Sequence, residues 1–95
     1  MNYSRIRPDV IDSINLYLEH GYDPGGFLTA VLENDLRESF SRADEYNRST
    51  LFEIVSYCWN EIPSESWGSH EKVDAWVKLL QKKKAEGGSN HENAS

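Results

Sequence analysis

Apolar side chains recur at helical spacing along most of this 95-residue chain, and no stretch alternates as a β-strand does. The clearest pattern predicts a helix over about 49–62. One of its faces carries five apolar side chains, namely Leu51, Ile54, Val55, Cys58 and Ile62. Phe52 and Trp59 widen that face, and Pro63 ends the helix. Its start is left open as far back as Ala43.

Two further helices are marked by the residues at their ends. Pro8 suits a first helical turn and Gly21 suits a C-terminal cap, which predicts a helix from about Pro8 to His20. Ser69 is a good N-cap residue, so another helix is expected to begin after it. The apolar face of this last helix is formed by Val73, Trp76, Val77 and Leu80.

The apolar positions between about 25 and 42 do not fit one straight helix with a narrow buried stripe. A first set consists of Phe27, Leu28 and Val31. A second set, Leu36, Phe40 and Ala43, projects roughly 100° away from the first. Because Asn34 and Asp35 are both good N-cap residues, we expect two short helices, at about 25–33 and 35–42. A single, broadly buried helix is the alternative.

Together these segments predict an all-α fold, a compact bundle of four or five short helices with a disordered C-terminal tail. The apolar pattern stops after Leu80, which gives a single helical domain at 1–81 and a disordered polar tail at 82–95. The predicted core consists of Ile11, Ile14, Leu18, Leu28, Val31, Leu36, Leu51, Ile54, Val55, Cys58, Trp59, Val73, Trp76 and Val77.

The charge of the chain narrows the classes of partner. Its formal net charge is −6, and up to Leu80 fourteen acidic residues face seven basic ones. An acidic body repels phosphate backbones, so we expect no direct nucleic-acid binding. No apolar run reaches the length of about 18 residues that a membrane span needs, and acidic residues interrupt the first twenty positions. A cytoplasmic protein that does not bind membranes is therefore expected.

Candidate chemistry is weak, so we expect no enzyme, no catalytic residue, no cofactor and no metal site. The chain has one cysteine and three histidines, with no His-x-x-x-His or Cys-x-x-Cys spacing. Cys58 lies on an apolar helix face, where a buried thiol is the expected role. Gly25 and Gly26 open a helix and offer free amide groups, which makes them a weak candidate anion-binding site.

Residues that break the burial pattern point to a binding surface. Tyr57 is predicted on the polar side of the helix at 49–62, near Glu53 and Glu61. Leu16 and Leu79 project off the apolar stripes of the first and last helices. Exposed aromatic side chains among charges are typical of partner-contacting surfaces, so these five residues form the predicted partner-binding set.

Several short motifs are spread over about residues 15–77. They are Pro24-Gly25-Gly26-Phe27-Leu28, Asn34-Asp35-Leu36, Ala43-Asp44, Asn47, Pro63, Trp67-Gly68-Ser69 and Trp76. In these motifs the chain resembles small proteins encoded by tailed bacteriophages and prophages. That group carries no established activity, so no catalytic role is transferred. The resemblance implies a small non-structural phage protein that acts in the cytoplasm of a bacterial host.

These observations lead to one main hypothesis of function and two alternatives. The main hypothesis is a non-enzymatic interaction protein that binds a bacterial host protein, such as a defence component, and modulates or inhibits it. One alternative is a DNA mimic, whose carboxylates would be Glu33, Asp35, Glu38, Asp44, Glu45, Glu53 and Glu61. The other is a small-ligand or nucleotide binder that uses the helix start at Gly25 and Gly26. Self-association into a homo-oligomer is also left open.

Overall fold

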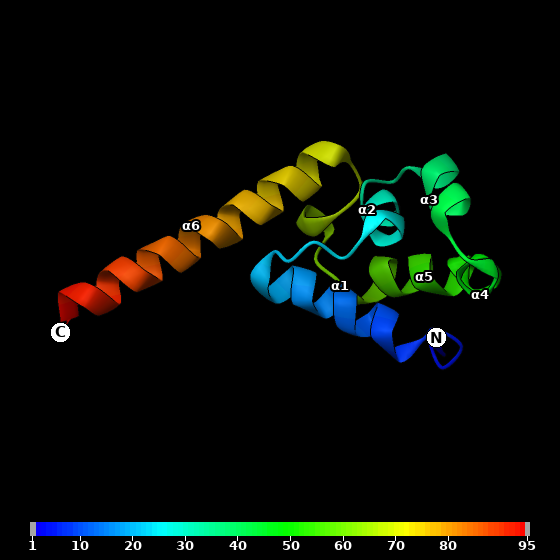
Figure 1. The fold of residues 1–95 in the computed structure, drawn as a ribbon, viewed down its shortest axis with the longest axis horizontal. Helices are drawn as coiled ribbons and strands as arrows, with labels where there is room; N and C mark the ends of the chain where they lie inside the picture. The colour runs from blue at the N-terminus through cyan, green and yellow to red at the C-terminus, as the bar shows by residue number, and fades with distance from the viewer. Residues whose placement is uncertain (1, 95) are drawn as a thin grey trace.

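The chain folds as a set of helices around one buried cluster (Figure 1). A computed structural model describes the backbone of residues 2–94 and the side chains of residues 2–85. The described residues form six α-helices and one turn of 3-10 helix, η1, and no strand. Their bounds are α1 (Pro8–His20), α2 (Gly26–Leu32), α3 (Leu36–Arg42), α4 (Glu45–Ser49), α5 (Leu51–Glu61), η1 (Ser64–Ser66) and α6 (His70–Ala94). The predicted all-α class is confirmed, with more helices than the four or five expected.

Local capping accounts for the helix ends that the sequence predicts correctly. Gly21 ends α1 at φ 73°, in the left-handed region, and its N–H donates to the Tyr17 carbonyl at 2.8 Å. Ser69 starts α6 by accepting from the Lys72 N–H through its hydroxyl at 3.1 Å. Because these signals depend on nearest neighbours only, they can be read without knowledge of the packing.

The predicted break between the second and third helices is confirmed at residues 33–35. Asn34 has φ 62° and turns the chain after α2. The Asp35 carboxylate then accepts from the Glu38 N–H at 3.1 Å and caps α3. The short helix α4 was not predicted as a separate element, although Asp44 caps it in the same way, at 2.8 Å from the Asn47 N–H.

The core is built mainly from α1, α2 and α5. Its least exposed side chains include Ile14 and Tyr17 of α1, Leu32 of α2, and Ile54 and Cys58 of α5. Tyr17 places its hydroxyl in the interior, where it donates to the Ser66 carbonyl at 2.7 Å. That bond joins α1 to η1 and satisfies a buried polar group.

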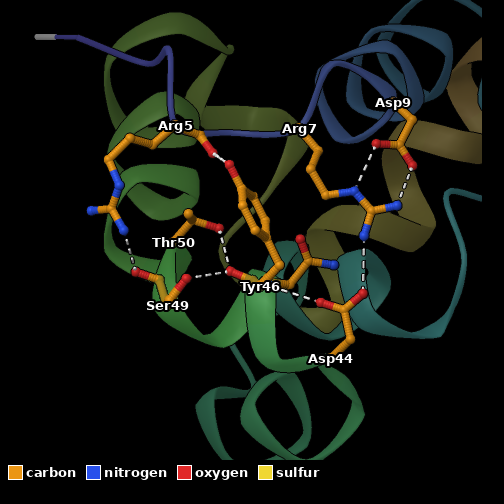
Figure 2. Close-up of polar contacts among 8 residues, drawn as sticks. Arg5, Arg7, Asp9, Asp44, Tyr46, Ser49 and Thr50 are labelled. Carbon is orange, nitrogen blue, oxygen red and sulfur yellow. Dashed lines mark hydrogen bonds and ion pairs between the residues drawn. The ribbon is translucent and has the colours of Figure 1, made fainter.

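The segment before α1 is a structural part of the domain, although no element was predicted there. Ile6 is buried in the core cluster, and Tyr3 packs against it. Figure 2 shows how polar contacts hold this segment to α4: Tyr46 donates its hydroxyl to the Arg5 carbonyl at 2.5 Å. The Arg7 guanidinium bridges Asp9 and Asp44 at 3.2 and 3.0 Å.

Three predicted core residues are exposed, and for them the prediction was wrong. Leu36 lies on the outer face of α3, while Val55 and Trp59 lie on the outer face of α5. The cause in α5 is its rotation, since Ile54 and Cys58 face inward and carry Val55 and Trp59 outward. The other predicted core residues are buried or pack half-buried against the cluster, namely Ile11, Ile14, Leu18, Leu28, Val31, Leu51, Ile54, Cys58, Val73, Trp76 and Val77.

Helix α6 packs on the body through its first half and then projects from it (Figure 1). Leu80 lies against the C-terminal end of α1. A Cβ at position 21, where the chain has glycine, would lie 3.6 Å from the Leu80 side chain. The four side chains of residues 82–85 are all exposed. The rest of the predicted tail at 82–95 lies outside the residues whose side chains are described.

The rotation of α5 leads to a stability prediction. We expect Trp59→Ala to change the free energy of unfolding by less than about 1 kcal/mol, as exposed substitutions do. Ile54 lies on the buried face of the same helix. Ile54→Ala should lower the free energy of unfolding by about 2–5 kcal/mol because it leaves a cavity in the core. Denaturant unfolding of both variants measures the difference. A Trp59 variant that loses as much stability as the Ile54 variant would place Trp59 in the core.

Candidate interaction surface

Helix α5 is apolar over more of its circumference than the fold can cover. At about 100° per residue, its apolar side chains span about 220°, from Tyr57 on one side of Ile54 to Phe52 on the other. The core takes the part of this arc that contains Ile54, Cys58 and Tyr57. The remaining part stays exposed: Trp59 at 78%, Phe52 at 73% and Val55 at 38%.

Contacts on the opposite side of α5 explain why Tyr57 is covered. Its ring packs edge-on against the Tyr3 ring, with 5.2 Å between centroids, and its hydroxyl donates to Asn15 Oδ1 at 3.4 Å. Glu53 pairs with Arg5 at 2.5 Å, and Glu61 accepts from the Tyr3 hydroxyl at 3.0 Å. The prediction that Tyr57 points to water was therefore wrong. All three residues are engaged within the chain.

The other two members of the predicted partner-binding set are exposed, as expected. Leu16 of α1 is 44% exposed and Leu79 of α6 is 42% exposed. Tyr57, which faces Asn15 of α1, lies about 160° around α5 from Trp59. Leu16 follows Asn15 on α1 and Leu79 lies on α6, so neither is part of the exposed stripe of α5.

Helix α3 adds a second exposed apolar stripe. Leu36 is 70% exposed, and Phe40, one turn later, is also exposed. A hollow of about 150 Å³ joins this helix to α5, and its apolar lining includes Val31, Leu36, Leu51, Val55 and Trp67. Leu36 and Val55 therefore border the same depression rather than two unrelated patches.

A larger hollow continues from the first. It has a volume of about 340 Å³ and is lined by Asn34, Trp59, Ile62, Ser64, Trp67, Gly68 and Lys72. Asn34 and Trp67 line both hollows, so the two adjoin. We call the apolar residues of this region the α3/α5 surface; they are the exposed Leu36, Phe40, Phe52, Val55 and Trp59 and the partly buried Trp67.

Two cations border this surface. Lys72 is the one charged residue lining the larger hollow, and its Nζ donates to the Ser64 carbonyl at 3.3 Å. The Arg48 guanidinium lies over the Phe40 ring, 4.6 Å from the centroid. The smaller hollow also includes Asp35, whose carboxylate is occupied in capping α3. The surface is thus apolar at its centre and positive at two points on its rim.

The Gly25–Gly26 helix start is already satisfied by the chain itself. The Asp23 carboxylate accepts from the Gly25 N–H at 2.8 Å, so a fixed negative charge stands where an anion would bind. Helix α2 is also short, at seven residues, which limits the field at its end.

Groups that could carry chemistry are dispersed or buried. Cys58 is fully buried, and burial raises the pKa of its thiol to about 12, which suits a packed side chain rather than a nucleophile. Within the described part of the chain, no three His, Cys, Asp or Glu side chains gather as metal ligands. None of the helices described here combines the length and apolar character of a membrane span.

Comparisons with protein-family models, with curated proteins and with solved structures each find no match to this chain. The resemblance to small phage proteins stays a prediction. The residues of the α3/α5 surface are therefore the main evidence for function. A wide apolar arc on the helix at 49–62 was the signal in the sequence that could have revealed them.

An ion pair between the end of α2 and the start of α6 gives a pH-dependent prediction. His70 Nδ1 lies 2.7 Å from Glu33 Oε2, and the hydrogen bond to Glu33 and its charge raise the pKa of His70, with smaller contributions from Glu71 and Asp74. The pair should stabilise the fold below the unfolded histidine pKa of about 6.5, and this gain is lost as the pH rises through the folded pKa.

Denaturant midpoints between about pH 5.5 and about pH 8.5 measure this loss. Replacing His70 by Gln should flatten the profile over this range. His20→Gln is the matched control, because His20 lies beside Glu19 on the same helix rather than across an interface. An unchanged profile in the His70 variant would show that the pair does not contribute to folding.

Proposed function

We propose that this chain is a non-enzymatic interaction protein that binds another protein through the α3/α5 surface. The observation that carries the proposal is the exposure of three large apolar side chains, Leu36, Phe52 and Trp59, each at 70% or more. Single exposed apolar residues are normal on a soluble protein. Here Leu36 and Trp59 border two adjoining hollows, an arrangement typical of a binding surface.

The chemistry of the surface supports a protein partner. Tryptophan is strongly enriched among residues that contribute most to binding, because its ring buries a large area with few rotatable bonds. Arg48 and Lys72 supply polar contacts at the rim, as interfaces commonly do. The one cysteine is buried in the core, and no metal-ligand cluster is found among the described residues, so the hollows are read as a binding surface.

The resemblance to small phage proteins gives the proposed partner a setting. On that basis the partner is a bacterial host protein, bound in the host cytoplasm and modulated or inhibited by the complex. The support for this step is the pattern of residues within 15–77 alone. Binding through the α3/α5 surface does not depend on it.

DNA mimicry gains no support from the placement of the carboxylates. Glu33, Glu38 and Glu53 face His70, Arg42 and Arg5 respectively. Asp35 and Asp44 cap helices, and Glu61 accepts from Tyr3. Six of the seven proposed phosphate mimics thus serve contacts within the chain, where their charge is partly neutralised. The small-ligand alternative is also disfavoured, because the Asp23 carboxylate already accepts from the Gly25 N–H that would bind the ligand.

The proposal predicts which exposed residues matter for binding. Trp59→Ala should weaken binding to a partner recovered from a bacterial lysate at least about tenfold, as the loss of a central aromatic anchor does. Leu16→Ala and Leu79→Ala are matched controls, because both remove exposed leucines elsewhere and should leave affinity unchanged. Titration of the purified partner, after unfolding measurements on each variant, gives the comparison.

The reverse ranking would contradict the proposal. If the Leu16 or Leu79 variant loses binding while the Trp59 variant keeps it, the functional surface lies on α1 and α6. Sedimentation of the purified chain over a range of concentrations separates binding to a foreign partner from self-association through the same surface.

A further inference from the structure

The two hollows of the α3/α5 surface are lined by side chains that lie one turn apart on α5. Val55 lines the smaller hollow and Trp59, four residues later on α5, lines the larger one. Positions four apart on a helix lie about 6 Å from each other along its surface. A partner that fills both hollows therefore needs two apolar side chains about one helical turn apart.

The charge around the larger hollow runs opposite to that of the whole chain. The net charge is −6, yet the one charged side chain in the lining is Lys72. The described residues give Lys72 no ion pair, whereas Lys78 on the same helix pairs with Asp74 at 2.9 Å. An occupant of the larger hollow should therefore carry a negative group near Lys72.

We propose that these hollows bind an amphipathic α-helix of the partner protein. The helix seats two apolar side chains, one turn apart, in the hollows beside Val55 and Trp59, and presents a carboxylate to Lys72. This inference rests on the proposed function and names the chemistry of its partner. A helix satisfies its own backbone hydrogen bonds, which matters here because the described residues offer no strand edge for an extended peptide.

Two other occupants fit the observations less well. A membrane surface is flat and commonly anionic, so it would neither fill the hollows nor attract a body of charge −6. A second copy of the chain brings the same negative body and the same cations to the contact. Both are outcomes of the test below.

The test is a selection from a library of displayed helical peptides on the full chain. The peptides are about 18 residues long, so that they hold a helix, and their exposed positions are randomised. The chain is immobilised through its C-terminus, because α6 runs away from α3 and α5 toward that end of the chain (Figure 1). The expected winners carry large apolar residues four positions apart with Asp or Glu close by.

Variants then test whether the selected peptides bind in the two hollows. Trp59→Ala should weaken the binding of a selected peptide at least about tenfold, and Leu79→Ala should leave it unchanged. A charge exchange gives the sharper readout. Selection on Lys72→Glu should return Lys or Arg at the position where the parent selects Asp or Glu, whereas Lys78→Glu should return the parent's pattern.

Several results would overturn the inference. These are a selection without a helical pattern, peptides that bind the Trp59 variant as well as the parent, and an unchanged pattern on Lys72→Glu. Trp59-dependent binding to vesicles of phosphatidylserine and phosphatidylcholine, or Trp59-dependent dimers in sedimentation, would replace the helix by a membrane or a second copy.

The failure of this inference can be separated from failure of the proposed function. If the natural partner needs Trp59 but binds equally to Lys72→Glu, the α3/α5 surface is an interface for a differently shaped or uncharged segment. In that case the proposed function stands and the helix does not. If the natural partner binds the Trp59 variant normally, both fall.

Discussion

The burial of Ile54 and Cys58 of α5 decides what the rest of the molecule presents to its surroundings. Both side chains are fully enclosed in the core cluster with Ile14 of α1 and Leu32 of α2. That contact fixes the rotation of α5, because side chains cannot shift around a helix independently of one another. Three apolar side chains lie about 100–160° around the helix from Ile54 and therefore face outward. They are Val55, Trp59 and Phe52. The exposed surface follows from the same packing that stabilises the core.

The opposite side of α5 is covered by a segment with no regular structure. Tyr3 contacts Tyr57 and Glu61 of α5, and Arg5 pairs with Glu53. At α4, Tyr46 and Asp44 bind the same segment (Figure 2). Each of these polar contacts is solvent-exposed and individually weak, of the order of 1 kcal/mol or less for an exposed ion pair. Together these contacts hold the N-terminal segment in place, with Ile6 in the core. They thereby determine which face of α5 is buried.

Some features of this fold can be predicted from the sequence and others cannot. The difference depends on how far apart in the sequence the interacting residues lie. Helix ends at Gly21, Asp35 and Ser69 depend on caps a few residues away, so they can be predicted correctly. The rotation of α5 depends on packing against Ile14, Leu32 and Tyr3, which are distant in the sequence, and its apolar arc fits two directions of burial. The mean direction of the apolar residues favours Val55 and Trp59 as core, and the contact with Tyr3 selects Tyr57 instead. The part of the candidate surface that lies on α5 was missed for that reason.

The composition of the chain bears on why such a surface can persist. A tryptophan, a phenylalanine and a leucine at 70% exposure or more favour self-association of an isolated domain. A net charge of −6 on 95 residues opposes it by mutual repulsion between copies. The cations Arg48 and Lys72 stand next to the apolar groups rather than dispersed over the body. This arrangement opposes contact between like copies at long range. Under the proposed function, it also favours a partner that is apolar and negative at the contact.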